Sequence, residues 1–477
     1  MNDLVKISAT EAVERLKTSE ISPLDLIDAA LERIQEIDGT LNALPTLCIE
    51  RAREHAKRLT EHPPNETPRG FLYGLPVAIK DLIEVAGVRS TFGSPIYADN
   101  IPDRSDYLVE TIEKRGGIVL AKSNTPEFGA GGNTFNEVFG KTRNPWNTGM
   151  TCGGSSGGSA VALATGEIWL ATGSDLGGSL RLPASFCSVV GLRPTPGRVA
   201  TGPSELPFGS LSVDGPMGRN VADVALFLDA QTGRHPGDPK SLESPAKPFT
   251  QAVKTAKLPK RVAFSPDLGI APVDGEIQDI CAAGSRVFES LNATVDLATI
   301  DFDGAEETFQ TLRAAQFVAT YAPMLETHRD QLKPEVVWNI EKGLKLTADE
   351  ISKAERARGN LYHRAAKFFE QYDLLVCPAS SVPPFNVDLR YPTHIGDVEL
   401  DNYIAWALIT FAITLTASPA ISVPCGFTKT GLPVGLQMVA PRGREDLLLS
   451  AAAAFEGSIG LSSNTPIDPI PMIEQLN

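Results

Sequence analysis

Two glycine- and serine-rich stretches, CGGSSGGS at residues 152–159 and GSDLGGS at residues 173–179, are the most unusual part of the 477-residue chain. Small residues let the backbone turn tightly and point several N–H groups into one concavity, which suits an anion. An apolar segment at residues 160–165 predicts a helix after the first stretch, and residues 168–172 predict a strand before the second. Because the two turns flank one strand, we interpret them as a working site rather than a flexible loop, for a phosphate or for the oxyanion of acyl transfer.

The details of these turns do not fit a phosphate-binding loop. A P-loop requires GxxxxGK[ST], and no lysine follows either glycine cluster. A dinucleotide fingerprint requires GxGxxG directly after a strand, and GGSSGG has neither that spacing nor that strand. The oxyanion interpretation is therefore favoured.

A nucleophile on such a loop needs a base. The six histidines lie in polar or helical contexts without a GxSxG elbow, so a Ser-His-Asp hydrolase is poorly supported. Lys80 ends the apolar run GLPVAIK at residues 74–80, which carries it toward the interior, where desolvation disfavours the ammonium form. Taken alone, an ion pair between Lys80 and Asp81 at the strand end is the simpler explanation of this lysine.

The rest of the chain alternates between strand and helix patterns. Short apolar runs predict strands at residues 76–79, 118–121, 168–172, 262–264, 374–376, 421–423 and 436–439. Helices are predicted at residues 107–115 and through most of 309–370, whereas residues 233–260 are rich in Pro, Lys and Ser and indicate a surface excursion. The pattern predicts an α/β fold whose sheet is covered on both faces.

The N-terminal region predicts two amphipathic helices. Ser22-Pro23 marks the start of the second, in which Leu24, Ile27, Leu31 and Ile34 form one apolar stripe. This stripe must pack on the body of the same chain or on a second copy.

Composition excludes several other classes of protein. With 43 Lys+Arg against 58 Asp+Glu, the net charge of −15 argues against a broad nucleic-acid-binding surface. Six separated cysteines without a CxxC pair indicate buried, reduced thiols, no metal site and a cytoplasmic protein, and the N-terminus lacks the pattern of a signal peptide. Residues 403–423 are long enough to cross a membrane, but Ser418-Pro419 interrupts them, so we predict a core helix, turn and strand instead.

At this point the sequence resembles the amidase signature family. The matching residues are GLPVAIKD at 74–81, GGSSGGS at 153–159 and GSDLGGSLRLPASFCSVVGLRPTPG at 173–197. RNPWN at 143–147, SPAISVPCGF at 418–427 and GLPVGLQMVA at 431–440 extend the likeness over nearly the whole chain. The resemblance implies a three-layer α/β/α sandwich around a twisted mixed β-sheet, and it replaces the simple ion-pair interpretation of Lys80.

The resemblance also implies a Ser–Ser–Lys triad. Ser179 would be the nucleophile, Ser155 (held through a cis Gly154–Ser155 peptide) would relay the proton, and Lys80 would be the general base. The backbone N–H groups of Leu176, Gly177, Gly178 and Ser179 would form the oxyanion hole. An acyl-enzyme would then be hydrolysed by water, with no metal and no organic cofactor.

Other residues near these motifs receive supporting roles. The small residues Gly129, Ala130, Gly131 and Gly132 match the segment that the family places beside the substrate carbonyl, and Ser156 is a further candidate for substrate binding. Asp175 and Arg181 are expected to form a buried pair that braces the nucleophile loop. The aromatic residues Phe317, Tyr321 and Trp338 are candidates for the pocket, although helix-spaced aromatics more often pack in a core than line a pocket.

The expected function is that of a stand-alone amidohydrolase that cleaves small aliphatic or aryl amides, with hydrazides, carbamates and anilides as further substrates. The alternative is the A subunit of a glutamyl-tRNA amidotransferase, which releases ammonia from glutamine. That subunit typically carries a DEFAMGSS-like segment, whereas this chain has NTPEFGAG at residues 124–131. We expect neither a nucleic acid nor a membrane as a partner, and we expect the protein to form a homodimer.

We expect one domain over residues 1–477 with four parts. These are an N-terminal helical segment with a possible dimer contact (1–65), the catalytic signature core (66–232), the surface excursion (233–260), and the remaining strands with the pocket helices (261–477).

Overall fold

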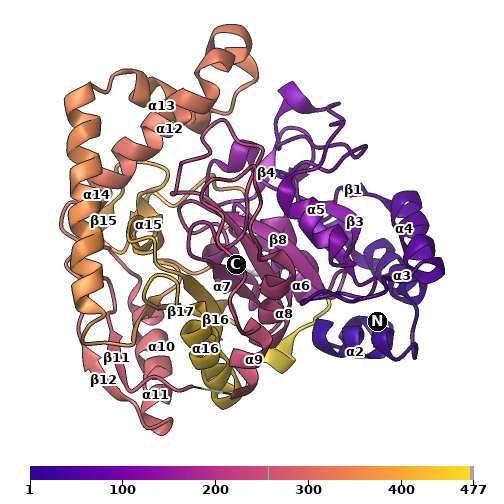
Figure 1. Cartoon of the computed structure of the whole chain (residues 1–477). Coiled ribbons are helices and arrows are strands. Elements are labelled where there is room, and N and C mark those ends of the chain that lie inside the picture. The colour runs from indigo at the N-terminus through magenta and orange to yellow at the C-terminus, as the bar shows by residue number, and fades with distance from the viewer. Residues whose placement is uncertain (256, 473–477) are drawn as a thin grey trace.

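The computed structural model describes residues 1–255 and 257–472. Its centre is an 11-stranded mixed sheet of order β1-β3-β2-β8-β10-β9-β16-β17-β13-β11-β12 (Figure 1). In that order the strands are Thr46–Leu47, Ile118–Ser123, Pro76–Lys80, Leu170–Asp175, Val213–Gly218, Val190–Arg193, Ala420–Phe427, Pro433–Val439, Leu374–Pro378, Arg261–Phe264 and Thr294–Leu297. Near one end of the sheet, β2 runs parallel to its neighbours β3 and β8. At the other end, β11 runs parallel to its neighbours β13 and β12. The pairs between these two groups, from β8 to β13, are antiparallel.

Helices precede, follow and connect these strands. The α-helices α1 to α16 are Asp3–Lys6, Ala9–Lys17, Pro23–Leu41, Ile49–Glu61, Tyr107–Lys114, Gly157–Thr165, Arg181–Cys187, Val221–Gln231, Phe249–Thr255, Gly275–Ser285, Val287–Ser290, Ala305–His328, Pro334–Leu344, Ala348–Phe368, Leu408–Leu415 and Glu445–Ile459. Three two-stranded ribbons lie outside the main sheet: β4 (Phe135–Asn136) with β5 (Gly140–Lys141), β6 (Arg143–Asn144) with β7 (Asn147–Thr151), and β14 (His394–Ile395) with β15 (Val398–Glu399).

Helices cover both faces of the sheet. A side chain on Gly215 of β10 would point at Leu180, beside the start of α7, whereas one on Gly218 would point at Val224 of α8. Residues 215 and 218 differ in parity along the strand, so α7 and α8 lie on opposite faces. Two neighbouring strands repeat this arrangement, because Gly435 of β17 faces Ser185 of α7 and Gly426 of β16 faces Ile280 of α10. The predicted α/β/α architecture on a mixed sheet is confirmed.

The N-terminal helices pack against the body of their own chain. α3 begins at Pro23 with a reciprocal capping box between Ser22 and Asp25. Of its apolar stripe, Ile27 and Ile34 are buried in the main core, and Leu24 remains 39% exposed. The middle and the end of the stripe are therefore buried against the body of the same chain, whereas its first residue is not.

Two other segments differ in how well the sequence predicts them. Residues 403–423 form α15, a turn and the start of β16, as expected, and no helix among the described residues is both long and apolar enough to cross a membrane. The stretch 233–260 is less detached than expected, because it contains α9, which packs against α8 and α16 and whose Phe249 is buried.

A buried ion pair ties the end of β2 to its neighbour β3. Lys122 and Asp81 are at most 1% exposed, and their Nζ and Oδ1 atoms lie 2.8 Å apart. Lys122 also donates to Ser90 Oγ (2.7 Å), and Asp81 accepts from the backbone and hydroxyl of Thr91. The pair fixes the segment after Lys80.

We predict that Lys122→Met lowers the free energy of unfolding by about 3–5 kcal/mol, because it leaves the Asp81 carboxylate buried without a cation. Denaturant unfolding of the variant and the wild type measures the change. The double variant Lys122→Met/Asp81→Asn should recover part of the loss, and a change in the single variant below about 1 kcal/mol would contradict this account of the pair.

Candidate active site

The candidate site lies where the parallel strands β2 and β8 end on the same edge of the sheet. Lys80 is the last residue of β2, and Asp175 is the last residue of β8. The glycine-rich loop 176–179 leads from β8 into α7, and Ser155 and Ser156 directly precede α6. Topology thus brings the three segments that carry the predicted triad to one place.

Lys80 is completely buried and surrounded by hydroxyl groups. Its Nζ donates to Ser155 Oγ (2.7 Å), Ser156 Oγ (2.9 Å) and Ser174 Oγ (2.9 Å). The ion pair with Asp81 that Lys80 alone suggested is not formed, because Asp81 pairs with Lys122. Burial lowers the pKa of Lys80 to about 7, although the more distant charges of Asp214 and Asp175 oppose this shift. A lysine of this kind is neutral in a large fraction of molecules at physiological pH.

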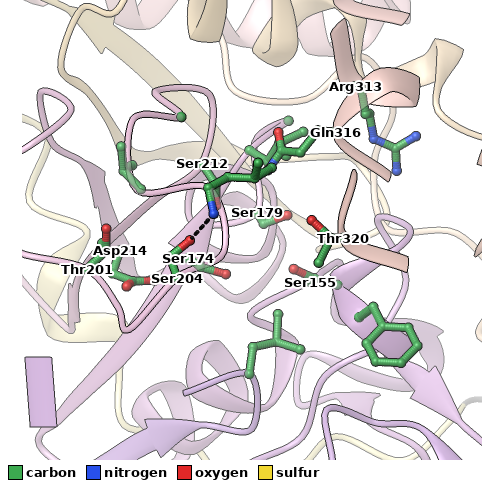
Figure 2. Close-up of a pocket in the computed structure, with 18 of the residues that line it drawn as sticks. Ser155, Ser174, Ser179, Thr201, Ser204, Ser212, Asp214, Arg313, Gln316 and Thr320 are labelled. Atoms are coloured by element: carbon green, nitrogen blue, oxygen red, sulfur yellow. Dashed lines mark hydrogen bonds between the residues drawn. The ribbon is translucent and has the colours of Figure 1, made fainter. Parts of the chain in front are cut away.

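Ser155 and Ser179 both line one cavity of about 410 Å³. The Gly154–Ser155 peptide is cis, as the resemblance implied. Ser155 contacts Lys80 behind the cavity wall, whereas the side chain of Ser179 has no hydrogen-bond partner among the described residues. The backbone N–H of Ser156 donates to the Ser179 carbonyl (3.2 Å), which ties the two serine loops together. Figure 2 shows Ser155, Ser174 and Ser179 around the same pocket.

The loop 176–179 is braced by Asp175. The carboxylate accepts from the N–H of Gly178 (3.0 Å) and of Leu180 (3.1 Å), and it pairs with Arg181 (2.8 Å) and Arg193 (3.2 Å). Although burial opposes ionisation, the two guanidinium groups hold the pKa of Asp175 well below its usual range. The expected buried pair of Asp175 and Arg181 is therefore present, with Arg193 as a third member.

One expected oxyanion-hole donor is differently engaged. The N–H of Gly178 donates to the Asp175 carboxylate, so it is not free to bind the substrate. In this respect the structure differs from our expectation that Gly178 is an oxyanion-hole donor. Its glycine is required for another reason: φ is +119°, and a Cβ would lie 2.4 Å from Thr410 Oγ1. Within the described residues, the N–H groups of Leu176, Gly177 and Ser179 have no hydrogen-bond acceptor, so these three remain as candidate donors.

The small residues at 129–132 are not equivalent. Gly129, Gly131 and Gly132 line the cavity, and a Cβ at Gly129 would lie 3.3 Å from Ser155 Oγ. Ala130 does not line the cavity: its side chain is buried in the apolar cluster that includes Phe317 and Leu332, and its carbonyl accepts from Lys333 Nζ (2.8 Å).

Ser156 also lies outside the cavity lining. It is fully buried behind the site, where its hydroxyl contacts Lys80 instead of facing the cavity. In this position Ser156 helps to hold the amine of Lys80, whereas we expected it to bind the substrate.

The structure adds residues that sequence reasoning missed. Ser174 is the third hydroxyl on Lys80, and the loop that begins at Thr201 forms one side of the cavity together with Val213 and Asp214 at the start of β10. The opposite side is one face of α12, on which the lining residues follow helical spacing: Arg313, Gln316, Phe317, Thr320 and Tyr321. Figure 2 places Thr201, Ser204 and Asp214 on one side of Ser179, and Arg313, Gln316 and Thr320 on the other.

Of the three aromatic candidates, two contribute to the cavity. Phe317 and Tyr321 line it, whereas Trp338 packs edge-on against Tyr403 with ring centroids 5.7 Å apart. Helical spacing from Arg313 could have identified the correct face of α12. No group of three His, Cys, Asp or Glu side chains that could hold a metal occurs in residues 1–255 and 257–472.

Comparison with known proteins places this geometry in a family. A sequence model of a protein family, described as Amidase, matches residues 25–449. An acylamidase of Rhodococcus erythropolis is 33% identical over 466 residues, which covers 97% of this chain and 98% of the relative. The A subunit of the glutamyl-tRNA(Gln) amidotransferase from Alkaliphilus metalliredigens is 34% identical over 474 residues, which covers 93% and 94%. The chain belongs to the amidase family.

Solved structures distinguish these two kinds of relative, acylamidases and amidotransferase subunits, more clearly than sequence identity does. A bacterial aryl acylamidase of the amidase signature family has a TM-score of 0.88 at 28% identity, covering 97% of this chain and 99% of its own. The corresponding amidotransferase chain from Thermotoga maritima has a TM-score of 0.72 at 28% identity, covering 94% and 93%. The prediction of an amide-cleaving hydrolase is confirmed, and the likeness in structure favours the acylamidase side of the family.

We predict that kcat/KM is constant above pH 8 and falls about tenfold per pH unit below a midpoint near the Lys80 pKa of about 7. The rate falls toward low pH because only the neutral amine accepts a proton, and the neutral form of Lys80 is lost as the pH falls through its pKa. Initial rates on an uncharged amide between pH 5 and 9 measure the profile.

Asp214→Asn is the matched control for this profile. The Asp214 charge raises the pKa of Lys80, so its removal should move the midpoint to lower pH. A profile that stays flat down to pH 5, in enzyme that remains folded there, would show that Lys80 is not the base.

Proposed function

We propose that the chain is a stand-alone amidohydrolase that cleaves the C–N bond of small carboxylic amides through Lys80, Ser155 and Ser179. The observation that carries the proposal is the buried contact of 2.7 Å between Lys80 Nζ and Ser155 Oγ, at the wall of the cavity that Ser179 also lines. A lysine without a carboxylate partner, in contact with a hydroxyl, is suited to accept a proton.

In the proposed mechanism, Ser179 Oγ attacks the amide carbonyl while its proton passes to Ser155, and the proton of Ser155 passes to neutral Lys80. The N–H groups of Leu176, Gly177 and Ser179 stabilise the oxyanion of the tetrahedral intermediate. Lys80 then returns the proton through Ser155 to the leaving nitrogen, the C–N bond breaks, and the amine departs. Water attacks the acyl-enzyme by the same proton route and releases the acid with Ser179 restored.

The cavity supports a small-molecule substrate. Its volume of about 410 Å³ lies within the range of about 300–1,000 Å³ that is common for ligand pockets. Phe128, Phe309, Phe317 and Leu182 supply apolar lining, which suits aliphatic or aryl groups. Anilides, hydrazides and carbamates of similar size are included in the proposal.

The amidotransferase chain is the second candidate, and its support is the 34% identity to such a protein. Against it stand the departure at residues 124–131 from that family member's usual segment and the lower TM-score of 0.72. We therefore propose an enzyme that acts without partner chains. The homodimer and the cytoplasmic location stay predictions.

We predict that the purified protein alone hydrolyses at least one non-glutamine substrate in a panel of aliphatic amides, anilides, aryl hydrazides, carbamates and glutamine. Ser179→Ala should lower kcat by about 10⁴-fold or more, because it removes the attacking atom. Release of amine and acid, followed by chromatography, measures turnover.

Ser212→Ala serves as the control for this experiment, since it removes another hydroxyl of the cavity lining, outside the triad. Turnover of glutamine alone would favour the amidotransferase. Undiminished turnover in Ser179→Ala would mean that the nucleophile is another residue.

A further inference from the structure

Arg313 of α12 is a buried cation in the wall of the cavity. Its side chain is only 3% exposed, and it belongs to the residues that line the cavity. Nη1 donates to Asn339 Oδ1 (2.5 Å), and Nη2 donates to the hydroxyl of Tyr403. The guanidinium carbon also lies 4.8 Å from the centre of the Phe317 ring. These contacts hold the guanidinium in place and use two of its five N–H donors.

No contact of Arg313 supplies a negative charge. Asn339, Tyr403 and Phe317 are neutral, and none of the ion pairs among the described residues includes its guanidinium. Three other buried arginines differ: Arg33 pairs with Glu36 and Asp468, and Arg181 and Arg193 both pair with Asp175. A fourth, Arg219, also has no ion pair among the described residues, but it donates to two backbone carbonyls, those of Val5 and Ile7, and does not line the cavity. A buried charge is costly unless it is paired, so the missing anion at Arg313 requires an explanation.

The charged groups around the cavity leave the Arg313 guanidinium without a carboxylate partner. A second cation, Lys342, lies nearby: burial, and then the charge of Arg313, lowers its pKa, whereas the charge of Glu306 opposes this shift. The carboxyl groups that line the cavity are Asp106, Asp214 and Glu205, and none of them pairs with Arg313. Figure 2 shows Asp214 on the far side of Ser179 from Arg313. The side that carries Asp214 has both signs of charge, because Lys240 lines the cavity there and its charge acts on Asp214. An anionic substituent is therefore attracted to the unpaired guanidinium on α12.

We propose that Arg313 is a specificity-determining residue that binds a carboxylate on the substrate, so that the preferred substrates are small amides bearing one carboxylate at the end that lies against α12. The three remaining N–H donors of the guanidinium supply charge-assisted hydrogen bonds to that carboxylate. Gln316 and Thr320, one turn and two turns further along the same face, are placed to contact the chain between the carboxylate and the scissile bond. This inference rests on the proposed amidohydrolase function and names its substrate class.

The test compares two pairs of substrates that differ only in charge at one end. In the first pair the acyl group varies: the 4-nitroanilides of succinic acid and of 4-methylpentanoic acid, in which an isopropyl group replaces the carboxylate. In the second pair the leaving group varies: the acetyl amides of 4-aminobenzoate and of 4-isopropylaniline. The measured quantity is the ratio of kcat/KM for the charged and the neutral member, in wild type, Arg313→Met and Arg313→Lys.

In the wild type we expect the charged member of at least one pair to be preferred by about 10–100-fold, which is the effect of hydrogen bonds to a charged group. Arg313→Met should reduce that ratio about tenfold or more, and Arg313→Lys should keep part of it because the charge remains. The ratio is internal to each variant, so a partial loss of folded protein does not alter it.

Two results would overturn the inference: no preference for the charged member in either pair, or the same ratio in the wild type and Arg313→Met. Failure of the proposed function looks different, because then none of the four amides is hydrolysed in a manner that depends on Ser179.

Discussion

The arrangement of the site depends on the buried carboxylate of Asp175. It receives the N–H groups of Gly178 and Leu180 and both guanidinium groups of Arg181 and Arg193, so one side chain at the end of β8 sets the shape of the nucleophile loop. Arg181 extends the network to Gln437 of β17 and to the Thr410 carbonyl of α15. Elements more than 200 residues apart therefore converge on this loop, and the loop keeps three backbone N–H groups directed away from other acceptors. Preorganised donors of this kind are effective because they need no reorganisation when charge develops.

The second constraint is the complete burial of Lys80. Its strand is buried at every position, and the structure surrounds the amine with hydroxyls of Ser155, Ser156 and Ser174 instead of a carboxylate. Two buried lysines on adjacent strands show the contrast. Lys122 has an ion pair with Asp81 and serves the fold, whereas Lys80 lacks one and keeps a pKa of about 7. The structural lysine and the proposed catalytic lysine thus differ in the oxygen atoms around them: a carboxylate for Lys122 and hydroxyl groups for Lys80. The same contrast between paired and unpaired cations distinguishes Arg181 from Arg313.

Much of the fold could be predicted from the sequence, and so could the segments that meet at the site, since apolar runs mark β2 and β3 and the glycine-rich motifs mark the loops around Ser155 and Ser179. β10 was not predicted, because VDGPMG contains glycines and a proline that are typical of a turn, yet antiparallel pairing with β8 and β9 holds it in the sheet. The aromatic residues alone did not identify the α12 face of the cavity, because helix-spaced aromatics such as Phe317 and Tyr321 give the same pattern whether they line a cavity or pack in a core; the spacing of the polar residues from Arg313 is the signal that could have done so. The engagement of the Gly178 N–H by Asp175 depends on tertiary geometry, and no motif records it.

The central claim of this account is that Ser179 forms a covalent acyl-enzyme. The most direct test is rapid acid quenching during turnover of a 4-nitroanilide, followed by proteolysis and mass measurement of the peptides. The account predicts a mass increase equal to the acyl group on the peptide that contains Ser179, and its absence in Ser179→Ala. An acyl group on Ser155, or an unchanged adduct in Ser179→Ala, would contradict the account.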